Sequence, residues 1–121
     1  MLPYNYVNKI WSRSKSRAKK SGISFTITLL DVENLGVPIS CPILGISLIL
    51  DHSHKQSDGS ISIDRIDSTR GYEPDNIRLI SWRANFLKNN ATLDEMMLLG
   101  DWAKEQRDNP DDHCELREAT Y

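Results

Sequence analysis

Three side chains between residues 60 and 90 carry the oxygen atoms that hard divalent cations prefer. Asp64 and Asp67 come at the end of one apolar segment, and Asn85 follows a second apolar segment. Carboxylate and amide oxygens are common ligands of such ions in proteins. An ion held by one carboxylate and one amide, with water completing its shell, suits cleavage of a phosphodiester bond. The spacing therefore predicts a metal-assisted hydrolytic site.

Each of these residues also has a structural interpretation. Asp and Asn next to Gly71 and Pro74 are ordinary turn formers. Asn85 would then be a surface helix residue, and Arg65 would form an ion pair with a flanking aspartate. Taken singly, the structural interpretation is favoured for each residue. The concentration of these residues at one strand end favours a site.

A hairpin followed by a helix has to bring these residues together. Strands are expected over 60–66 and 76–80, where isoleucine and leucine recur. A helix is expected over 82–89, and Ser81 is placed to cap it. Because this helix must fold back on the hairpin, Asn85 is expected near the end of the first strand.

Helices are expected at both ends of the chain, which makes the fold class α+β. Residues 4–20 predict a basic helix with one apolar stripe, and Gly22 is placed to end it. Residues 92–107 predict a helix that opens with a capping box. Its buried side is expected to comprise Leu93, Met96, Met97, Leu99, Gly100 and Ala103. Between these helices we expect a strand over 25–28, helical turns over 29–35 and a strand over 46–50.

The net charge of −2 conceals an uneven distribution of charged side chains. Residues 1–30 carry lysines and arginines but no acid, whereas the charged residues of 91–121 are mostly acidic. This asymmetry predicts one side that faces a polyanion and one that faces away from it. The alternative is a solvated helix face with a solubilising tail. The cations expected to contact the phosphates of such a polyanion are Lys9, Arg13, Arg17, Lys20, Arg78, Arg83 and Lys88.

Length and cysteine usage limit the remaining classes. With 121 residues, the chain suits one domain over 1–108 and an acidic tail over 109–121. Cys41 and Cys114 lack zinc-ribbon spacing, so we expect no structural zinc and a reducing, cytoplasmic setting. No apolar run approaches the ~18 residues that a membrane span needs. Residues 1–7 lack the pattern of a signal peptide.

The segment SIDRIDSTRGYEPDNIRLISWRANFLKNNATL, supported by RAKKSGISFTIT and CPILG, resembles the His-Me finger, or HNH, endonuclease family. The resemblance extends from about residue 12 to residue 102 and is greatest for small phage-type members. It implies a ββα-metal core over about 60–90, one divalent cation (Mg²⁺ or Mn²⁺), and nicking or cutting of double-stranded DNA. A phage-encoded member would act in the host cytoplasm without a membrane partner. A homodimer or a second phage protein stays open as a further partner.

The resemblance also implies roles for individual residues. Asp64 matches an acid that binds the metal ion, and Asn85 matches a ligand that is His in most members and Asn in some. Asn76 matches the Asn that braces the loop and orients the general base. Position 65 holds Arg where the family has its general-base His, and Arg does not deprotonate in proteins. Asp64, Arg65, Asp67 and Asn76 are the expected catalytic residues.

Three alternatives for the missing base stay open. A second register, in which Asp-Arg-Ile-Asp matches the motif of nonspecific members, places Asp67 in the base position. Alternatively, His52 or His54 reaches in from the preceding loop. In the third, Arg65 only stabilises charge, and a metal-bound water loses its proton to solvent. Asp67 is our preferred candidate, with Arg65 in contact with phosphate.

Three classes of function are compatible with the sequence. The first is a divalent-metal-dependent DNA endonuclease. The second is a DNA-binding module that has kept the HNH fold and lost cleavage, which the absence of His at position 65 favours. The third is a structural protein that binds a partner through its acidic C-terminal helix.

Overall fold

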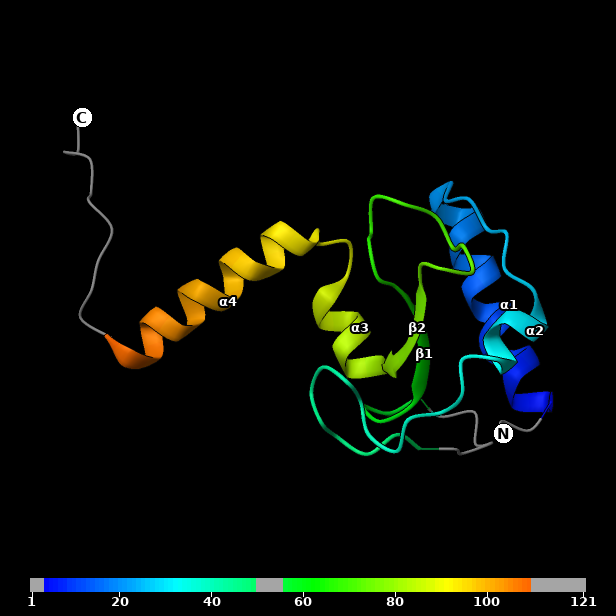
Figure 1. Cartoon of the computed structure of the whole chain (residues 1–121), viewed down its shortest axis with the longest axis horizontal. Helices are drawn as coiled ribbons and strands as arrows, with labels where there is room; N and C mark the ends of the chain where they lie inside the picture. Colours follow the sequence, from blue (N-terminus) through cyan, green and yellow to red (C-terminus); the bar gives the residue numbers. More distant parts are fainter. Residues whose placement is uncertain (1–3, 50–55, 110–121) are drawn as a thin grey trace. The chain divides into compact units, whose positions relative to one another are not determined.

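A two-stranded antiparallel sheet lies at the centre of the first part of the chain (Figure 1). The structure is a computed structural model, and it describes residues 4–49 and 56–109. The chain divides into two compact units, Met1–Ala91 and Thr92–Tyr121. The elements in chain order are α1 (Tyr4–Ser21), α2 (Leu29–Glu33), β1 (Ile61–Arg65), β2 (Ile77–Ser81), α3 (Trp82–Lys88) and α4 (Leu93–Asp108). The expected α+β class is confirmed.

The two faces of the hairpin pack against different parts of the molecule. β1 and β2 pair so that Asp64 lies opposite Arg78 and Ile63 lies opposite Leu79. Because side chains alternate along a strand, these two pairs point to opposite faces. The face with Ile63 and Leu79 is buried in the main core with the apolar side of α1. The other face, which carries Ser62 and Asp64, lies against α3 (Figure 1).

Helix α1 supplies the other half of the main core. Its buried side chains recur every three or four residues, which confirms the predicted stripe. Gly22 ends the helix with a φ of +68°, a conformation that glycine adopts without strain. The indole Nε1 of Trp11 donates to the main-chain oxygen of Ile27 at 3.0 Å. The buried members of the stripe are Tyr6, Val7, Ile10, Ser14 and Ala18.

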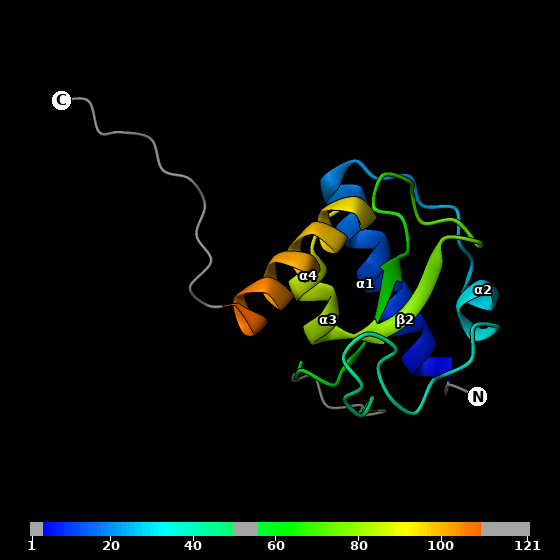
Figure 2. The same cartoon turned by 60° about the vertical axis from the view of Figure 1, so that its left-hand side comes forward.

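Helix α3 begins directly where β2 ends, so the hairpin fixes its position (Figure 2). The Ser81 hydroxyl accepts a hydrogen bond from the Ala84 main-chain nitrogen at 3.1 Å and caps the helix as expected. Ile80, Ala84 and Cys41 form a second buried cluster beneath it. The Cys41 sulfur also accepts a hydrogen bond from the Ser81 hydroxyl at 3.2 Å. The strand-to-helix junction is therefore held at several points.

The strand predicted over 46–50 is wrong for the part that the structure describes. Ser47 and Ile49 each make only a single bridge, to Ser40 and Ser60 respectively. The segment at Ser47 passes close to the main chain at Gly59. Glycine is needed there, because a Cβ would lie 2.7 Å from the main-chain oxygen of Ser47. The segment thus pairs at two isolated positions with two different neighbours and forms no continuous ladder.

The strand predicted over 25–28 is also absent, and this segment forms an isolated bridge instead. Phe25 makes a single parallel bridge with Tyr72. A Cβ at Gly71 would lie 2.7 Å from the main-chain oxygen of Ser24, so glycine is needed for this approach. The helical turns expected over 29–35 are present as α2, with Thr28 and Asp31 forming a capping box.

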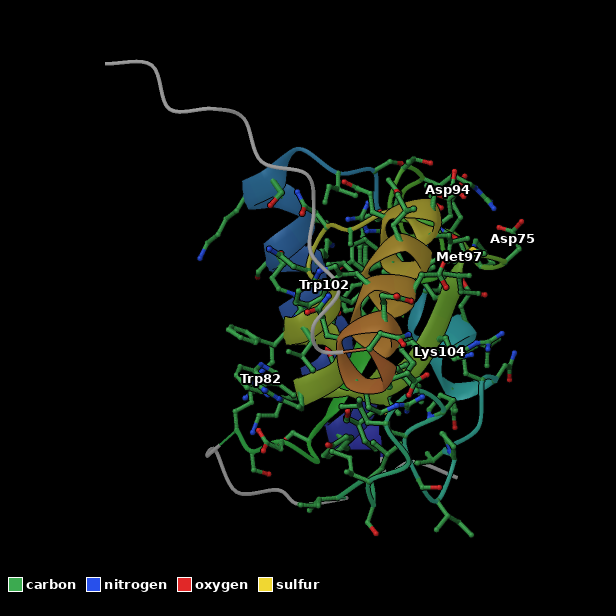
Figure 3. All side chains as sticks on the ribbon, turned by 90° about the vertical axis from the view of Figure 1, so that its left-hand side faces the viewer. Asp75, Trp82, Asp94, Met97, Trp102 and Lys104 are labelled. Atoms are coloured by element: carbon green, nitrogen blue, oxygen red, sulfur yellow. The ribbon has the colours of Figure 1, made fainter. Side chains whose placement is uncertain are left out.

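Helix α4 lies within one residue of the expected bounds but does not have the expected buried side. Thr92 and Glu95 form the predicted capping box, with the Glu95 main-chain nitrogen 3.1 Å from the Thr92 hydroxyl. No residue of α4 is buried in the described structure. Met97 and Trp102 lie on different sides of the helix (Figure 3), so its apolar side chains do not gather into one stripe. Among the described residues, no helix is long and apolar enough to cross a bilayer.

Candidate functional site

Asp64 forms a buried ion pair with Lys88, across the interface between β1 and α3. Lys88 Nζ lies 2.9 Å from Asp64 Oδ1 and 2.8 Å from Oδ2, and both side chains are less than a tenth exposed. The ammonium also donates to the main-chain oxygen of Arg65. Burial raises the pKa of the Asp64 carboxyl, and the hydrogen bond and charge of Lys88 oppose that increase. Lys88 is thus enclosed in the interface and is not placed for the predicted phosphate contact.

The Lys88 ammonium also bears on the predicted cation site at Asp64 and Asn85. Both oxygens of the Asp64 carboxylate already face a positive charge, and a divalent cation would have to displace that charge or share the carboxylate with it. Within the described ranges, no three His, Cys, Asp or Glu side chains are grouped so that they could hold a metal ion. A divalent cation at Asp64 and Asn85 would therefore require the ion pair between Asp64 and Lys88 to open.

Asn85 lies on the same side of the hairpin as Asp64. Its amide Nδ2 donates to the Ser62 hydroxyl at 2.6 Å, which fixes the first turn of α3 against β1. Ser62 and Asp64 share one strand face, and Asn85 and Lys88 are three residues apart on α3. Two polar contacts, Asn85 to Ser62 and Lys88 to Asp64, therefore run side by side along this interface.

Asn76 braces the turn between the strands. Its Oδ1 accepts a hydrogen bond from the Asp67 main-chain nitrogen at 2.9 Å, and its Nδ2 donates to the main-chain oxygens of Asp67 and Gly71 at 3.0 and 2.9 Å. Only 1% of the residue is exposed. Both the oxygen and the nitrogen of the amide make hydrogen bonds, so Asn76 fixes the main chain at Asp67.

Asp67 stands in the turn, held by its neighbour Thr69. Its Oδ1 accepts hydrogen bonds from the Thr69 hydroxyl at 2.6 Å and from the Thr69 main-chain nitrogen at 2.9 Å. These bonds, led by the hydroxyl, lower the pKa of the Asp67 carboxyl. The side chain is therefore ionised at neutral pH, so it can accept a proton, although less readily than a carboxylate with an ordinary pKa.

Arg65 points to the opposite face of β1 from Asp64. Its Nη1 donates to the main-chain oxygens of Ser68 and Arg70, both at 2.8 Å. The guanidinium lies 5.5 Å from the centre of the Tyr72 ring. The cation is thus held by carbonyl oxygens and an aromatic ring, with no carboxylate among these contacts.

Three of the exposed cations of α1 lie close together on that helix. Arg13, Arg17 and Lys20 line one shallow depression together with Ser16. All three are exposed, and Lys9 is partly exposed. Arg78 on β2 and Arg83 on α3 are also exposed. These side chains are accessible to a polyanion, in contrast to Lys88.

An open pocket of about 550 Å³ adjoins the interface between β1 and α3. Its lining includes two of the predicted catalytic and metal-binding residues, Arg65 and Asn85, but not Asp64 or Asp67. Arg17 from α1 also lines it. The predicted site residues are thus divided between this pocket, the buried ion pair and the turn.

His52 and His54, the alternative bases, lie outside the described residues. Their relation to the hairpin stays a prediction.

Two contacts of the site were not predicted from the sequence. Ser62 could have been found from strand alternation, because it shares a face with Asp64. Lys88 could have been found from helix periodicity, because it is one turn beyond Asn85. Neither strand alternation nor helix periodicity predicts that the Lys88 ammonium is buried, because its burial depends on how closely α3 packs on β1.

The chain was compared with known proteins. No protein-family model matches it, and no curated protein matches it. The solved structure of the rare-cutting HNH restriction endonuclease PacI is similar to it, with a TM-score of 0.57 and 27% sequence identity. The match covers 82% of this chain and 77% of that chain. The fold is HNH-like. This HNH-like fold agrees with the hairpin and helix described above.

Proposed function

We propose that this HNH-like chain is an endonuclease that nicks or cuts double-stranded DNA. The observation that carries the proposal is its structural similarity to the HNH restriction endonuclease PacI over most of both chains. The exposed cations of α1 support it, because Lys and Arg neutralise phosphates along a DNA backbone. Arg17 of that helix lines the same pocket as Ser68 of the turn and Asn85 of α3.

The residues of this chain have distinct tasks in the proposal. Arg13, Arg17 and Lys20 grip the DNA backbone. Asn76 fixes the turn, and Asp67 in that turn takes a proton from the attacking water. The water oxygen bonds to phosphorus, and the bond from phosphorus to the leaving oxygen breaks.

Dependence on Mg²⁺ or Mn²⁺ is part of the proposal, because the resemblance to the HNH family implies it. The Asp64–Lys88 pair must open before Asp64 can bind an ion. The metal requirement is therefore a separate question from DNA cleavage, and each needs its own measurement.

A DNA-binding module without cleavage is the second candidate. The observation that favours it is the Lys88 ammonium on both oxygens of Asp64. A second reason to favour this candidate is that position 65 holds Arg, which cannot act as a base, where the HNH family has its general-base His. Such a protein would retain the basic surface and the fold without hydrolysing DNA.

A plasmid-nicking assay distinguishes the two candidates. Purified protein is incubated with supercoiled plasmid in Mg²⁺, in Mn²⁺ and in EDTA, and DNA binding is measured in parallel by a mobility shift. The endonuclease proposal expects relaxed circles with a divalent ion and none in EDTA. Binding without relaxed circles in any condition would support the second candidate. Absence of both binding and nicking would exclude both candidates.

A further inference from the structure

The pocket beside α3 has an aromatic wall. Trp82 and Phe86, one helical turn apart, stack with their ring centres 5.4 Å apart and an angle of 23° between their planes. Both rings line the pocket. Phe86 is 61% exposed, so much of its ring surface is available to a ligand. A flat apolar ligand can stack there, because aromatic rings associate favourably in offset arrangements.

Another part of the pocket lining carries side-chain amides. Asn85, Asn89 and Asn90 all line it. Asn85 directs its Nδ2 to Ser62, which leaves its amide oxygen as an acceptor for a ligand. Asn89 and Asn90 are exposed. A side-chain amide offers a donor and an acceptor together, which matches the edge of a nucleobase.

The charges around the pocket favour an anionic ligand. Arg17 and Arg65 line it, and no Asp or Glu is among its lining residues in the described structure. Arg65 is fixed by carbonyl oxygens, whereas Arg17 is exposed and donates to the Ser14 hydroxyl at 3.1 Å. The volume of about 550 Å³ is within the range of ~300–1,000 Å³ that is typical of small-molecule sites.

We propose that this pocket takes an unpaired nucleobase of the bound nucleic acid. The base stacks on Phe86, the amides of Asn85 and Asn89 bond its edge, and Arg17 lies toward the adjoining phosphate. The inference rests on the proposed action on DNA, and it specifies which part of the DNA enters the pocket. A paired base cannot stack there, because both of its faces are covered in the duplex.

The test compares two duplexes of one sequence, one fully paired and one with a single bulged 2-aminopurine. Affinities for wild-type protein are measured by fluorescence anisotropy, and base stacking is followed through the 2-aminopurine emission. Wild-type protein is expected to prefer the bulged duplex by about 5- to 150-fold, the range for one base stacked on an aromatic side chain. Its binding should also quench the emission. Phe86→Leu keeps an apolar side chain but removes the stacking surface, so the preference and the quenching should disappear.

Leu87→Ala is the matched control, because Leu87 is the next residue, is 56% exposed and does not line the pocket. It should keep the wild-type preference, and circular dichroism should show that both variants are folded. Equal affinity of wild-type protein for the two duplexes would overturn the inference while leaving DNA binding intact. A preference that survives Phe86→Leu, or that Leu87→Ala also removes, would likewise overturn it. Failure to bind either duplex would overturn the proposed function as well.

Discussion

At the scale of single residues, the buried pair of Asp64 and Lys88 is the most consequential contact. Removing one partner of a buried ion pair leaves an uncompensated charge, which typically costs about 3–5 kcal/mol. Lys88→Met should therefore lower the free energy of unfolding by about that amount. The double variant Asp64→Leu/Lys88→Met should recover much of this stability, because apolar groups of similar volume often replace such a pair at little cost.

Urea unfolding at pH 7 measures both effects. Lys19→Met on the exposed side of α1 is the control, and it should stay within about 0.5 kcal/mol of wild type. A Lys88→Met variant as stable as wild type would show that the ammonium is not held by Asp64 in solution.

The carboxyl of Asp67 should titrate below its ordinary range. Its folded pKa is lowered, so its contribution to stability is present above the unfolded value of about 3.9 and is lost as pH falls through the folded value. Thr69→Val removes the hydroxyl donor and should raise the pKa toward about 3.9. An NMR titration of the Asp67 carboxyl carbon in both proteins measures this, and identical titration curves would contradict the geometry of the turn.

At the scale of elements, the hydrogen bonds of Asn76 stabilise the turn between β1 and β2. Asn76→Asp keeps the shape of the side chain but turns a donor toward the main-chain oxygens of Asp67 and Gly71 into an acceptor. Each buried group left unsatisfied costs about 1–3 kcal/mol. We expect a decrease in stability of at least that size in urea unfolding. The exposed Asn90→Ala serves as control, and an equal effect of both changes would exclude the bracing role.

The main elements could be predicted from local sequence, whereas their contacts could not. The stripe of α1, the strand alternation around Ile63 and the capping box at Thr92 are short-range patterns, and all three are present. The strand predicted around Ser47 was wrong because its bridges run to two different segments, from Ser47 to Ser40 and from Ile49 to Ser60, so no continuous ladder forms. The burial of Lys88 could not be predicted, because its charge and position in the sequence suit a phosphate contact and only the packing of α3 on β1 encloses it.

At the scale of the whole molecule, DNA binding should depend on the basic side of α1. Replacing Arg13, Arg17 and Lys20 by Gln should weaken binding to all duplex sequences. The slope of log affinity against log salt should flatten by about 0.9 for each phosphate that the variant no longer neutralises. Lys104→Gln on α4 is the control for a change of charge alone. A slope that the triple variant leaves unchanged would mean that this side of α1 faces solvent.

The central claim is that the chain cleaves duplex DNA through the polar residues of the hairpin and α3. The most direct measurement is the rate of nicking of supercoiled plasmid by wild-type protein and by Asp64→Leu/Lys88→Met, with Mg²⁺ or Mn²⁺ and with EDTA. The double variant is the sharper comparison, because it removes the carboxylate without leaving a buried charge. We predict that wild-type protein nicks only with a divalent ion and that the folded double variant does not nick. Nicking by the double variant at the wild-type rate, or no nicking by wild-type protein that binds DNA, would contradict the claim.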